Sequence, residues 1–551
     1  MSLSIQALTK RVPVFAAVAA ALVGLVNIAS TLTPNIRWRW HLLLGFEPVE
    51  AIRLFHALSL PAGAALLLVA PYLAKRRRRA MQTAVALMLA LGLFDLLKGF
   101  DFEETILTWG VAVVLVLSRD AFTVRHDPAT LRSAVWRAPV LALMGLAVAM
   151  VAVWTGTHAS FGTVTTETFD LLRYQPGPIH FHHHIPIGVH MLEIWTLLVI
   201  AYVIFRPLTV PRTPPSRVTR QVASDLVRAH GADTLAFFKL RADGHYVFSE
   251  DRRAFVGYAI ENGVLLLSGD PVGAPDALPG LLQQVREFAD ARGLKLGALG
   301  ASEKLCPLYE ELGLRAIYLG DEAVVELDRF SLEGRPIRKV RQSVTRLSKA
   351  GYEAELHELH TLDQSTIDQA EKVVELGRQG APERGFSMAM ESLQGEHDHE
   401  TLVVLARDEA GAIRGVLHFV PCYGRPAVSL SFMRRDPTTP NGLTEFLVVR
   451  AIELLRERGL EELSLNFAAF AKWMHSPEKR LERLLGKVIA LGNPFFQIES
   501  LYRFNAKFFP RWEPRFLVYE GTFGLPRAGI AAMWAEGQLP KPRIRRASAA
   551  R

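Results

Sequence analysis

Two arginines followed by a turn and a helical pattern form the first group of residues that could carry chemistry. Arg434 and Arg435 end the strand-like run AVSLSFMRR, and DPTTPNG leads from them into LTEFLVVRAIELLRERG. Asn441 is the expected N-cap of that helix, because its side chain can accept a hydrogen bond from a free amide of the first turn. A helix N-terminus beside two arginines predicts a site for an anion such as a phosphate.

A second group of bases, mixed with aromatic residues and two prolines, lies in LYRFNAKFFPRWEPRFLVYE, residues 501–520. Lys507 is expected to anchor a phosphate or stabilise negative charge together with Arg434. The alternative is a closing helix and an edge strand whose aromatic residues lie in the core. The residues of this stretch predicted to contact a substrate are Lys507, Asn505, Trp512 and Arg515, with Arg511 in support.

The proton acceptor of this predicted site is less well defined than its bases. Glu445 lies one turn into the helix, where it fits a general base and equally an acid that stabilises the helix start. Ser431 lies on the strand three residues before Arg434 and is included among the candidate catalytic residues. His418 in the run VLHFV is expected to be a packed or hydrogen-bonded histidine.

A basic helix is predicted between these groups and the preceding sequence, in RPIRKVRQSVTRLSKAG, residues 335–351. At about 100° per residue, its bases fall within an arc of about 160° and its valines and leucine on the other side. We expect Arg338 and Arg341 on this face to contact the phosphates of a nucleic acid or a lipid. A merely solvated face is the alternative. The bases are Arg338, Lys339, Arg341, Arg346 and Lys349.

Composition indicates what kind of protein must position these residues. The chain has 551 residues, 50% of them hydrophobic, which is too long for one ordinary domain and too apolar for a purely soluble protein. Its net charge of +8 favours anionic partners. The two cysteines, Cys306 and Cys422, argue against a disulfide framework and a zinc site, and no metal is expected.

Apolar runs in the first 205 residues predict a transmembrane bundle of about six helices. Bases gather in alternate loops, which places both termini and the whole second half of the chain in the cytoplasm. The loop of residues 155–186 then lies outside. The six helices are expected to begin near Val12, Phe55, Met81, Glu104, Ala138 and Ile187.

Polar residues in this half have two interpretations each. A run of histidines in the outer loop could bind a transition metal, but a solvated or interfacial role is expected. Asp95, Lys98 and Glu193 could mark a polar pathway, or could snorkel from helix ends. The histidines are His180, His182, His183 and His184.

After a basic, proline-rich linker at residues 206–220, strand-like and helical runs alternate, which predicts an α/β region. We divide it into a first unit at 221–335, the basic connecting helix at 336–352, a second unit with the active site at 353–525, and a basic tail at 526–551. Strands are expected at TLAFFKL, HYVFSE, AVVEL, TLVVLARD, AIRGVLHFV, AVSLSFMRR and EELSLNFA.

Four separated pieces of this region resemble the soluble domain of the aminoacyl-phosphatidylglycerol synthases, which include the lysyl and alanyl enzymes known as multiple peptide resistance factors. The resemblance covers about residues 221–521, in the expected order. The pieces are GDPVG, FSLEGRPIRKVRQSVTRLSKAGY, SLSFMRRDPTTPNGLTEFL and LYRFNAKFFPRWEPRFLVYEG.

The resemblance implies a tandem acetyltransferase-like (GNAT) fold that moves an amino acid from aminoacyl-tRNA to a glycerol hydroxyl of phosphatidylglycerol. Such an enzyme reduces the negative charge of the membrane and gives resistance to cationic peptides. The implied partners are aminoacyl-tRNA, phosphatidylglycerol and anionic membrane lipids. Whether the protein forms a homo-oligomer is left open. No cofactor is implied, because the R/Q-x-x-G-x-G/A loop of coenzyme A binding is missing after Arg435.

This chain departs from the family pattern in two places. Members have an acid three residues before the arginine that matches Arg434, where this sequence has Ser431. The general base and the choice of amino acid therefore stay open. With about six helices, synthesis without a complete flippase is the expectation. The alternatives are a transferase with another lipid acceptor, such as diacylglycerol, and a non-enzymatic transporter or sensor.

Overall fold

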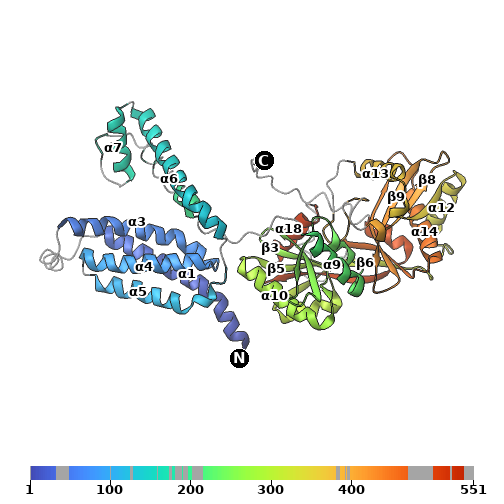
Figure 1. Ribbon diagram of the computed structural model, residues 1–551, viewed down its shortest axis with the longest axis horizontal. Helices are drawn as coiled ribbons and strands as arrows, with labels where there is room; N and C mark the ends of the chain where they lie inside the picture. Colours follow the sequence, from blue (N-terminus) through green and yellow to red (C-terminus); the bar gives the residue numbers. More distant parts are fainter. Residues whose placement is uncertain are drawn as a thin grey trace. The chain divides into compact units, whose positions relative to one another are not determined.

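The computed structural model divides into two compact units, which are described separately: Met1–Val210 with Asp290–Gly293, and Pro211–Ala289 with Leu294–Arg551. Figure 1 shows their elements. The residues described are 2–32, 49–99, 101–124, 128–157, 159–172, 177–179, 186, 189, 196–201, 215–379, 385–390, 392–393, 398–469, 501–521 and 524–538.

Four helices of the first unit form a ring in which α1 packs on α3 and α5, and α4 packs on the same two helices. Glycines permit the closest approach, since a Cβ on Gly24 of α1 would lie 2.9 Å from the carbonyl oxygen of Gly63 of α3. A further pair, α6 and α7, packs together. The helices are α1 (Ser2–Leu32), α3 (Val49–Ala74), α4 (Arg78–Gly99), α5 (Phe102–Leu117), α6 (Pro128–Thr157) and α7 (Phe161–Leu172).

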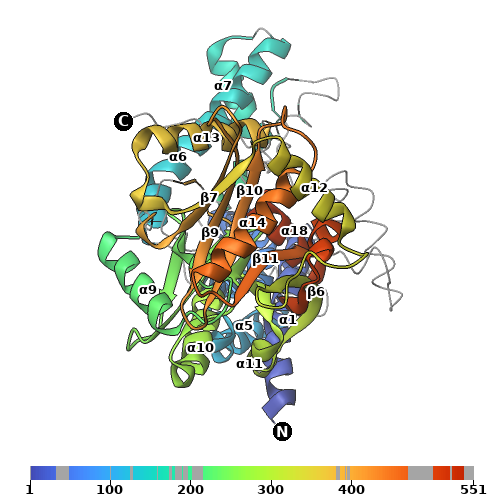
Figure 2. The ribbon, with the colours of Figure 1, turned by 90° about the vertical axis from the view of Figure 1, so that its right-hand side faces the viewer.

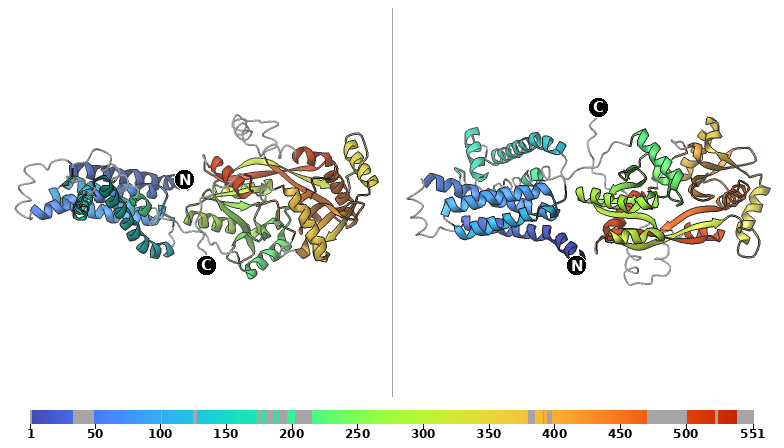
Figure 3. Two further views of the ribbon diagram at one scale, coloured as in Figure 1. Left: turned by 90° about the horizontal axis from the view of Figure 1, so that it is seen from above. Right: turned by 60° about the horizontal axis from the view of Figure 1, so that its bottom comes forward.

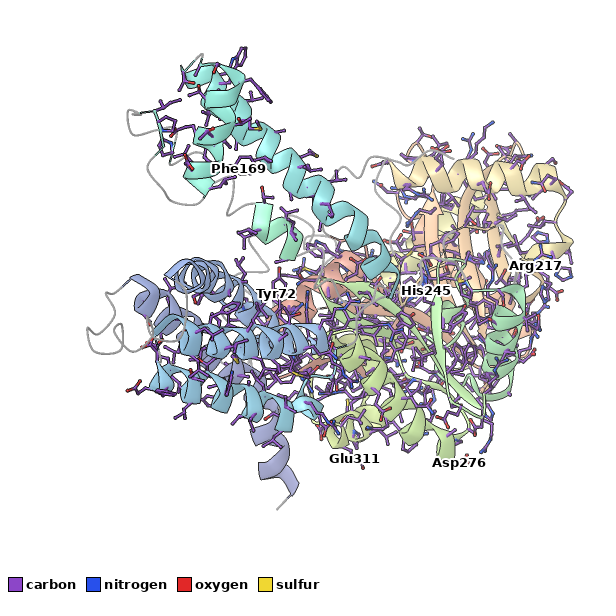
Figure 4. The ribbon with its side chains drawn as sticks, turned by 60° about the vertical axis from the view of Figure 1, so that its left-hand side comes forward. Tyr72, Phe169, Arg217, His245, Asp276 and Glu311 are labelled. Carbon is purple, nitrogen blue, oxygen red and sulfur yellow. The ribbon has the colours of Figure 1, made fainter. Side chains whose placement is uncertain are left out.

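Three of the described helices are long and apolar enough to cross a membrane, through Val12–Ser30, Arg78–Leu97 and Ala138–Thr155, and Ala62–Ala74 is a shorter apolar stretch. The predicted number of about six is not confirmed. The expected outer loop at 155–186 contains helix α7, whose Phe169 is labelled in Figure 4 and is 45% exposed. Most of the segment expected to begin near Ile187 lies outside the described residues.

Polar side chains lie inside the four-helix ring. Asn27 of α1 donates through Nδ2 to Oγ1 of Thr108 of α5 at 3.5 Å, and Thr105 donates to the carbonyl of Gly92 of α4 at 3.2 Å. Asp95 is fully buried, which does not fit snorkelling to the interface. The four histidines and the side chains of Lys98 and Glu193 lie outside the described residues.

One sheet of twelve strands runs through the whole second unit, in the order β1-β2-β3-β5-β12-β6-β11-β10-β9-β8-β7, with β4 paired to β2. Figure 2 shows the second half of this sheet, with β6, β11, β10, β9 and β7 labelled. The strands are β1 (His245–Phe248), β2 (Ala254–Glu261), β3 (Val264–Ser268), β4 (Val272–Gly273), β5 (Lys295–Ser302), β6 (Leu314–Glu326), β7 (Glu353–Glu358), β8 (Leu402–Arg407), β9 (Ile413–Cys422), β10 (Ala427–Arg435), β11 (Glu462–Ala469) and β12 (Arg511–Glu520).

Strand β12 does not stay with the strands that precede it in sequence. It lies between β5 and β6, antiparallel to both, while β6 also pairs with β11. The edge strand considered for this stretch is therefore a central one. Its Pro514 is tolerated because β5 pairs only with residues 515–519, so β12 has one neighbour, β6, at the proline.

Helices cover both faces of the second half of this sheet. On one face, α12 and α14 bury a core with Leu417 and Phe419 of β9. On the other, α13 packs on Val416 of β9, as expected when neighbouring strand residues point to opposite faces. Figure 3 shows these layers from two further sides. The helices of the unit are α9 (Arg217–His230), α10 (Leu278–Ala291), α11 (Cys306–Glu311), α12 (Arg338–Lys349), α13 (Gln364–Arg378), α14 (Leu443–Glu457) and α18 (Leu525–Ala535).

Two local predictions for this unit are wrong. The run TLAFFKL contains the 3-10 helix Phe237–Leu240 instead of a strand. All four residues of this helix are buried, so the run has an apolar composition like that of a central strand. The segment expected to begin a basic tail contains α18, which buries Leu525, Ala528, Ala531 and Ala532.

Candidate functional site

The parallel strands β10 and β11 separate part of the way along their length. They pair from Ala427–Glu462 to Ser429–Ser464. Beyond this point β10 has an irregularity between Leu430 and Phe432. In β11 the register shifts after Ser464, and Asn466 has a φ of 68°. Ligands of α/β sheets bind beyond the carboxyl ends of such strands, so this split is a candidate site.

Residues 385–390, here called the strap, are bonded to both strands at the split. Ser431 Oγ of β10 accepts a hydrogen bond from the amide of Met390 at 2.9 Å. Asn466 Nδ2 of β11 donates to the carbonyls of Met388 at 2.6 Å and Leu430 at 3.1 Å. Ser431, predicted as catalytic, is thus a strap contact and is only 7% exposed.

The two arginines at the end of β10 contact different elements. Arg435 donates through Nη1 to the carbonyl and to Oγ1 of Thr439, at 3.0 and 2.9 Å, which closes the turn towards α14. Arg434 lies against α13, where a Cβ on Gly377 would be 3.2 Å from the Arg434 Cβ. The predicted pairing of both arginines at one anion site is not what the structure shows.

Helix α14 begins at Leu443, as expected, but its N-cap is one residue later than predicted. Its N-cap is Gly442, with a φ of 94°, and Asn441 provides a backbone carbonyl that accepts a hydrogen bond from Arg346 of α12. A Cβ on Gly442 would lie 2.6 Å from Ser343 Oγ of α12, so only glycine permits this approach. The prediction that the Asn441 side chain caps the helix is wrong.

Glu445 and Lys507, which were predicted separately, form an ion pair with Lys507 Nζ 2.7 Å from Glu445 Oε1. Their side chains are 19% and 42% exposed, so the pair is open to solvent. Lys507 Nζ also lies 5.2 Å from the ring centre of Phe504. A carboxylate beside an ammonium can accept a proton while the ammonium stabilises an oxyanion.

The basic helix has the predicted two faces. Val340, Val344 and Leu347 are buried, and Arg338 and Lys339 are exposed. Arg341 instead donates to the carbonyls of Leu332 and Gly334, at 2.5 and 3.2 Å, so part of its role is to hold the preceding loop. An open hollow of about 410 Å³ is lined by Arg341, Gln342, Thr345, Arg346 and Lys349.

Arg515 does not reach a substrate surface, contrary to expectation. Its side chain is 3% exposed and donates to Asp233 at 3.0 Å and to Glu322 at 2.8 Å. Glu322 also accepts from Thr234 and from Ser464 of β11. The guanidinium therefore joins the first half of the sheet to the strand beside the split.

Burial shifts the pKa values of several groups around Arg515. It would raise the pKa of Asp233, but Arg515 and Lys239 hold that pKa at about 2. Burial and the charge of Asp233 raise the pKa of Asp270 to about 6, and burial lowers the pKa of Lys239 to about 8. Sequence reasoning missed this cluster. The one available signal was Lys239, a lone base inside the apolar run AFFKL.

The remaining predicted contact residues have partners within the protein. Asn505 is fully buried and donates to the carbonyl of Leu465 at 3.5 Å, and Trp512 stacks on Tyr502 at 4.7 Å between ring centres. Arg511 pairs with acids of β6, β11 and β12. His418 is buried against Phe432, as expected, and burial lowers its pKa to about 3.

Among the residues that the structure describes, no group of three or more histidines, cysteines and acids could hold a metal ion. The predicted catalytic residues fall into two places: Glu445 and Lys507 lie with α14, whereas Ser431 and Arg434 lie with the strap and α13.

Residues 224–519 match the family described as "Phosphatidylglycerol lysyltransferase, C-terminal". Proteins named lysylphosphatidylglycerol biosynthesis bifunctional protein LysX are similar. The one from Gordonia bronchialis is 31% identical over 81% of this chain and 41% of its own length, and that from Rhodococcus jostii is 36% identical over 58% and 29%.

Among solved structures, L-PGS from Bacillus licheniformis has the same fold, with a TM-score of 0.53 at 20% identity over 60% of this chain and 99% of its own. The present chain spans less than half the length of the two LysX relatives. The matched family region contains both halves of the sheet, the split and α12. The chain belongs to the phosphatidylglycerol lysyltransferase C-terminal family.

Proposed function

We propose that the protein is a membrane-bound aminoacyltransferase that moves an amino acid from aminoacyl-tRNA to a glycerol hydroxyl of phosphatidylglycerol. The names of its relatives support lysine as the amino acid. The product lowers the negative charge of the membrane, which would give resistance to cationic peptides.

The observation that carries this proposal is the arrangement of cations around the first turn of α14. Arg346 binds the carbonyl of Asn441 on one side, and Lys507 binds Glu445 in the turn itself. In acetyltransferase-like folds this junction holds the pyrophosphate of coenzyme A, whose loop is missing here. A cationic helix, α12, lies there instead, and its open hollow suits the phosphates of a tRNA acceptor end.

The reaction exchanges one ester for another. The glycerol oxygen forms a bond to the acyl carbon, the bond from that carbon to the ribose oxygen breaks, and the proton of the glycerol hydroxyl passes to the ribose oxygen. We assign proton acceptance to Glu445 and stabilisation of the oxyanion to Lys507, which lie 2.7 Å apart. Alignment of hydroxyl and ester supplies the rest of the acceleration.

The location of this reaction follows from the two units. The first unit contains helices able to cross a membrane by length and composition. We propose that the second unit faces the cytoplasm, since aminoacyl-tRNA is found there and bases gather in the loops predicted to be cytoplasmic.

The test is a lipid extract from a host that lacks aminoacylated lipids, analysed by mass after expression of the full chain. Lysyl-phosphatidylglycerol is expected. Detection of an aminoacylated diacylglycerol instead would show that diacylglycerol is the acceptor. An unchanged lipid profile together with lipid transport would favour a transporter or sensor.

The site assignment is tested in the same host with Lys507→Ala. Loss of the ammonium beside Glu445 is expected to lower product formation by about a hundredfold, with the amount of folded protein unchanged. Lys372→Ala, which removes an exposed lysine of α13, is the matched control and should behave as the unaltered protein. Normal turnover in Lys507→Ala would show that the active site does not lie at the start of α14.

A further inference from the structure

The strap is held along almost its whole length by side chains from distant parts of the chain. Besides its contacts to Ser431 and Asn466, it accepts a hydrogen bond from Arg241 Nη1 to the carbonyl of Ala389 at 2.6 Å. Ser268 Oγ donates to the carbonyl of Phe386 at 3.4 Å. Backbone groups away from regular structure are usually bonded to water or to local turns, so this degree of fixation requires an explanation.

The strongest of these contacts comes from Glu536, at the end of α18. Its carboxylate accepts hydrogen bonds from the amide of Phe386 at 3.0 Å, from the amide of Ser387 at 3.0 Å and from Ser387 Oγ at 2.6 Å. Glu536 is 5% exposed and Ser387 is fully buried. Charge-assisted bonds of this kind are about twice as strong as neutral ones, and their loss leaves buried amides without acceptors.

Helix α18 brings this carboxylate from the first half of the sheet to the second. It packs against β2, β3 and β12, whereas the other end of the strap touches β10 through Ser431 and β11 through Asn466. Glu536 also lies beyond the region 224–519 that matches the family.

We propose that Glu536 is a positioning residue for aminoacyl transfer: acting through the strap, it fixes Ser431 and Asn466 and so sets the opening between β10 and β11. The effect on catalysis rests on the proposed function, whereas the effect on the strap does not. Because Glu536 binds one end of the strap and the split binds the other, release of the carboxylate frees the strap to shift at Met388 and Met390.

The test compares Glu536→Ala and Glu536→Gln in the full chain, in detergent micelles with phosphatidylglycerol and lysyl-tRNA. For Glu536→Ala, kcat is expected to fall at least about tenfold, with KM for the tRNA changed less than about twofold. Glu536→Gln keeps one carbonyl acceptor and should fall between this variant and the unaltered protein. Amide hydrogen exchange in residues 385–390 should accelerate while exchange in β8 and β9 stays slow.

Arg527→Ala is the matched control on the same helix. Arg527 is exposed and donates to the carbonyl of Asn262 at 2.7 Å, at the end of α18 away from the strap. This variant also loosens a contact of α18, but it should leave kcat within about twofold of the unaltered value. If Glu536→Ala does not fold, Ser387→Ala removes one of the three bonds without changing α18 and should give a smaller loss of kcat.

Two results would overturn the inference. Unchanged strap exchange in both Glu536 variants would show that the carboxylate does not hold the strap. Faster strap exchange with unchanged kcat would show that the strap does not position the site. If the unaltered protein forms no aminoacylated lipid, the proposed function fails, and the exchange measurement still decides whether Glu536 holds the strap.

Discussion

Two buried carboxylates, Asp270 and Glu322, and the half-buried Asp233 meet the buried cations Arg515 and Lys239 where the two halves of the sheet join. Asp233 and Glu322 each bind the Arg515 guanidinium directly. Asp270 accepts a hydrogen bond from the amide of Ser302 at 3.0 Å, and its burial and the charge of Asp233 raise its pKa. Buried charges are tolerated only when they are paired and hydrogen-bonded.

Replacing this carboxylate should therefore stabilise the protein. Asp270→Asn keeps an oxygen to accept from Ser302 but removes the negative charge. The folded-state pKa of Asp270, about 6, lies above the ordinary 3.8, so the original protein loses stability as pH rises between these values. The variant lacks that loss and should be more stable by about 3 kcal/mol at about pH 7 and by nearly nothing at about pH 4.

Pulse proteolysis of the full chain in urea, repeated across this pH range, measures the difference. The control is Asp276→Asn, which changes an exposed acid of the 3-10 helix Pro275–Ala277 just before α10 (Figure 4). It should show no gain as pH rises, because the hydrogen bond from Arg253 lowers the pKa of Asp276. A variant that is less stable than the original at pH 7 would mean that Lys239 needs the Asp270 charge.

At the scale of elements, α12 shows how far sequence periodicity can lead. Its two faces were predictable because they depend on local spacing, whereas the helix predicted at residues 336–352 is longer than the observed Arg338–Lys349. The diversion of Arg341 to the carbonyls of Leu332 and Gly334 was not, since it depends on the path of the preceding loop. Lys339 and Lys349 are exposed and are better probes of the basic face.

The proposed use of aminoacyl-tRNA predicts that reversal of both lysines to Glu raises KM for this substrate at least about tenfold at low salt, because phosphate contacts dominate such affinities. The difference should shrink at high salt, as screening weakens the original contacts, and the salt dependence of log KM should fall by about one per lysine. The same reversal at exposed Lys304 and Lys372 is the control. Equal KM values for the variant and the unaltered protein at low salt would show that the basic face of α12 is solvated and does not bind the tRNA.

At the scale of the whole molecule, the sequence predicts elements better than their partners. The strands β8 to β11 and helix α14 follow from local patterns, and all lie where they were expected. The position of β12 between β5 and β6 depends on contacts with residues about two hundred positions away, which no local pattern encodes.

The candidate site was predictable to the same degree. The residue types Glu445 and Lys507 were identified, but their ion pair joins segments 62 residues apart. Arg515 resembled a substrate base because its acidic partners, Asp233 and Glu322, lie far from it in sequence. The contacts of Ser431 and Glu536 with the strap join segments 41 and 149 residues apart, so no local spacing indicates them.

Because β12 lies between β5 and β6, we expect that the first half of the sheet cannot fold without the end of the chain. A fragment of residues 215–335 lacks β12, which joins β5 to β6, and also β11, which pairs with the other side of β6. It therefore exposes one edge of β5 and both edges of β6 and should aggregate. Co-expression with a second fragment, residues 336–538, which keeps α12 on its core, should give a soluble complex that copurifies through a tag on either piece. Val518→Asp in the second fragment, which places a charge at a fully buried position of β12, should abolish copurification, whereas Arg527→Ala should not. A soluble 215–335 fragment with native strand content would show instead that β5 and β6 can close on each other, and that β12 only covers an already folded half.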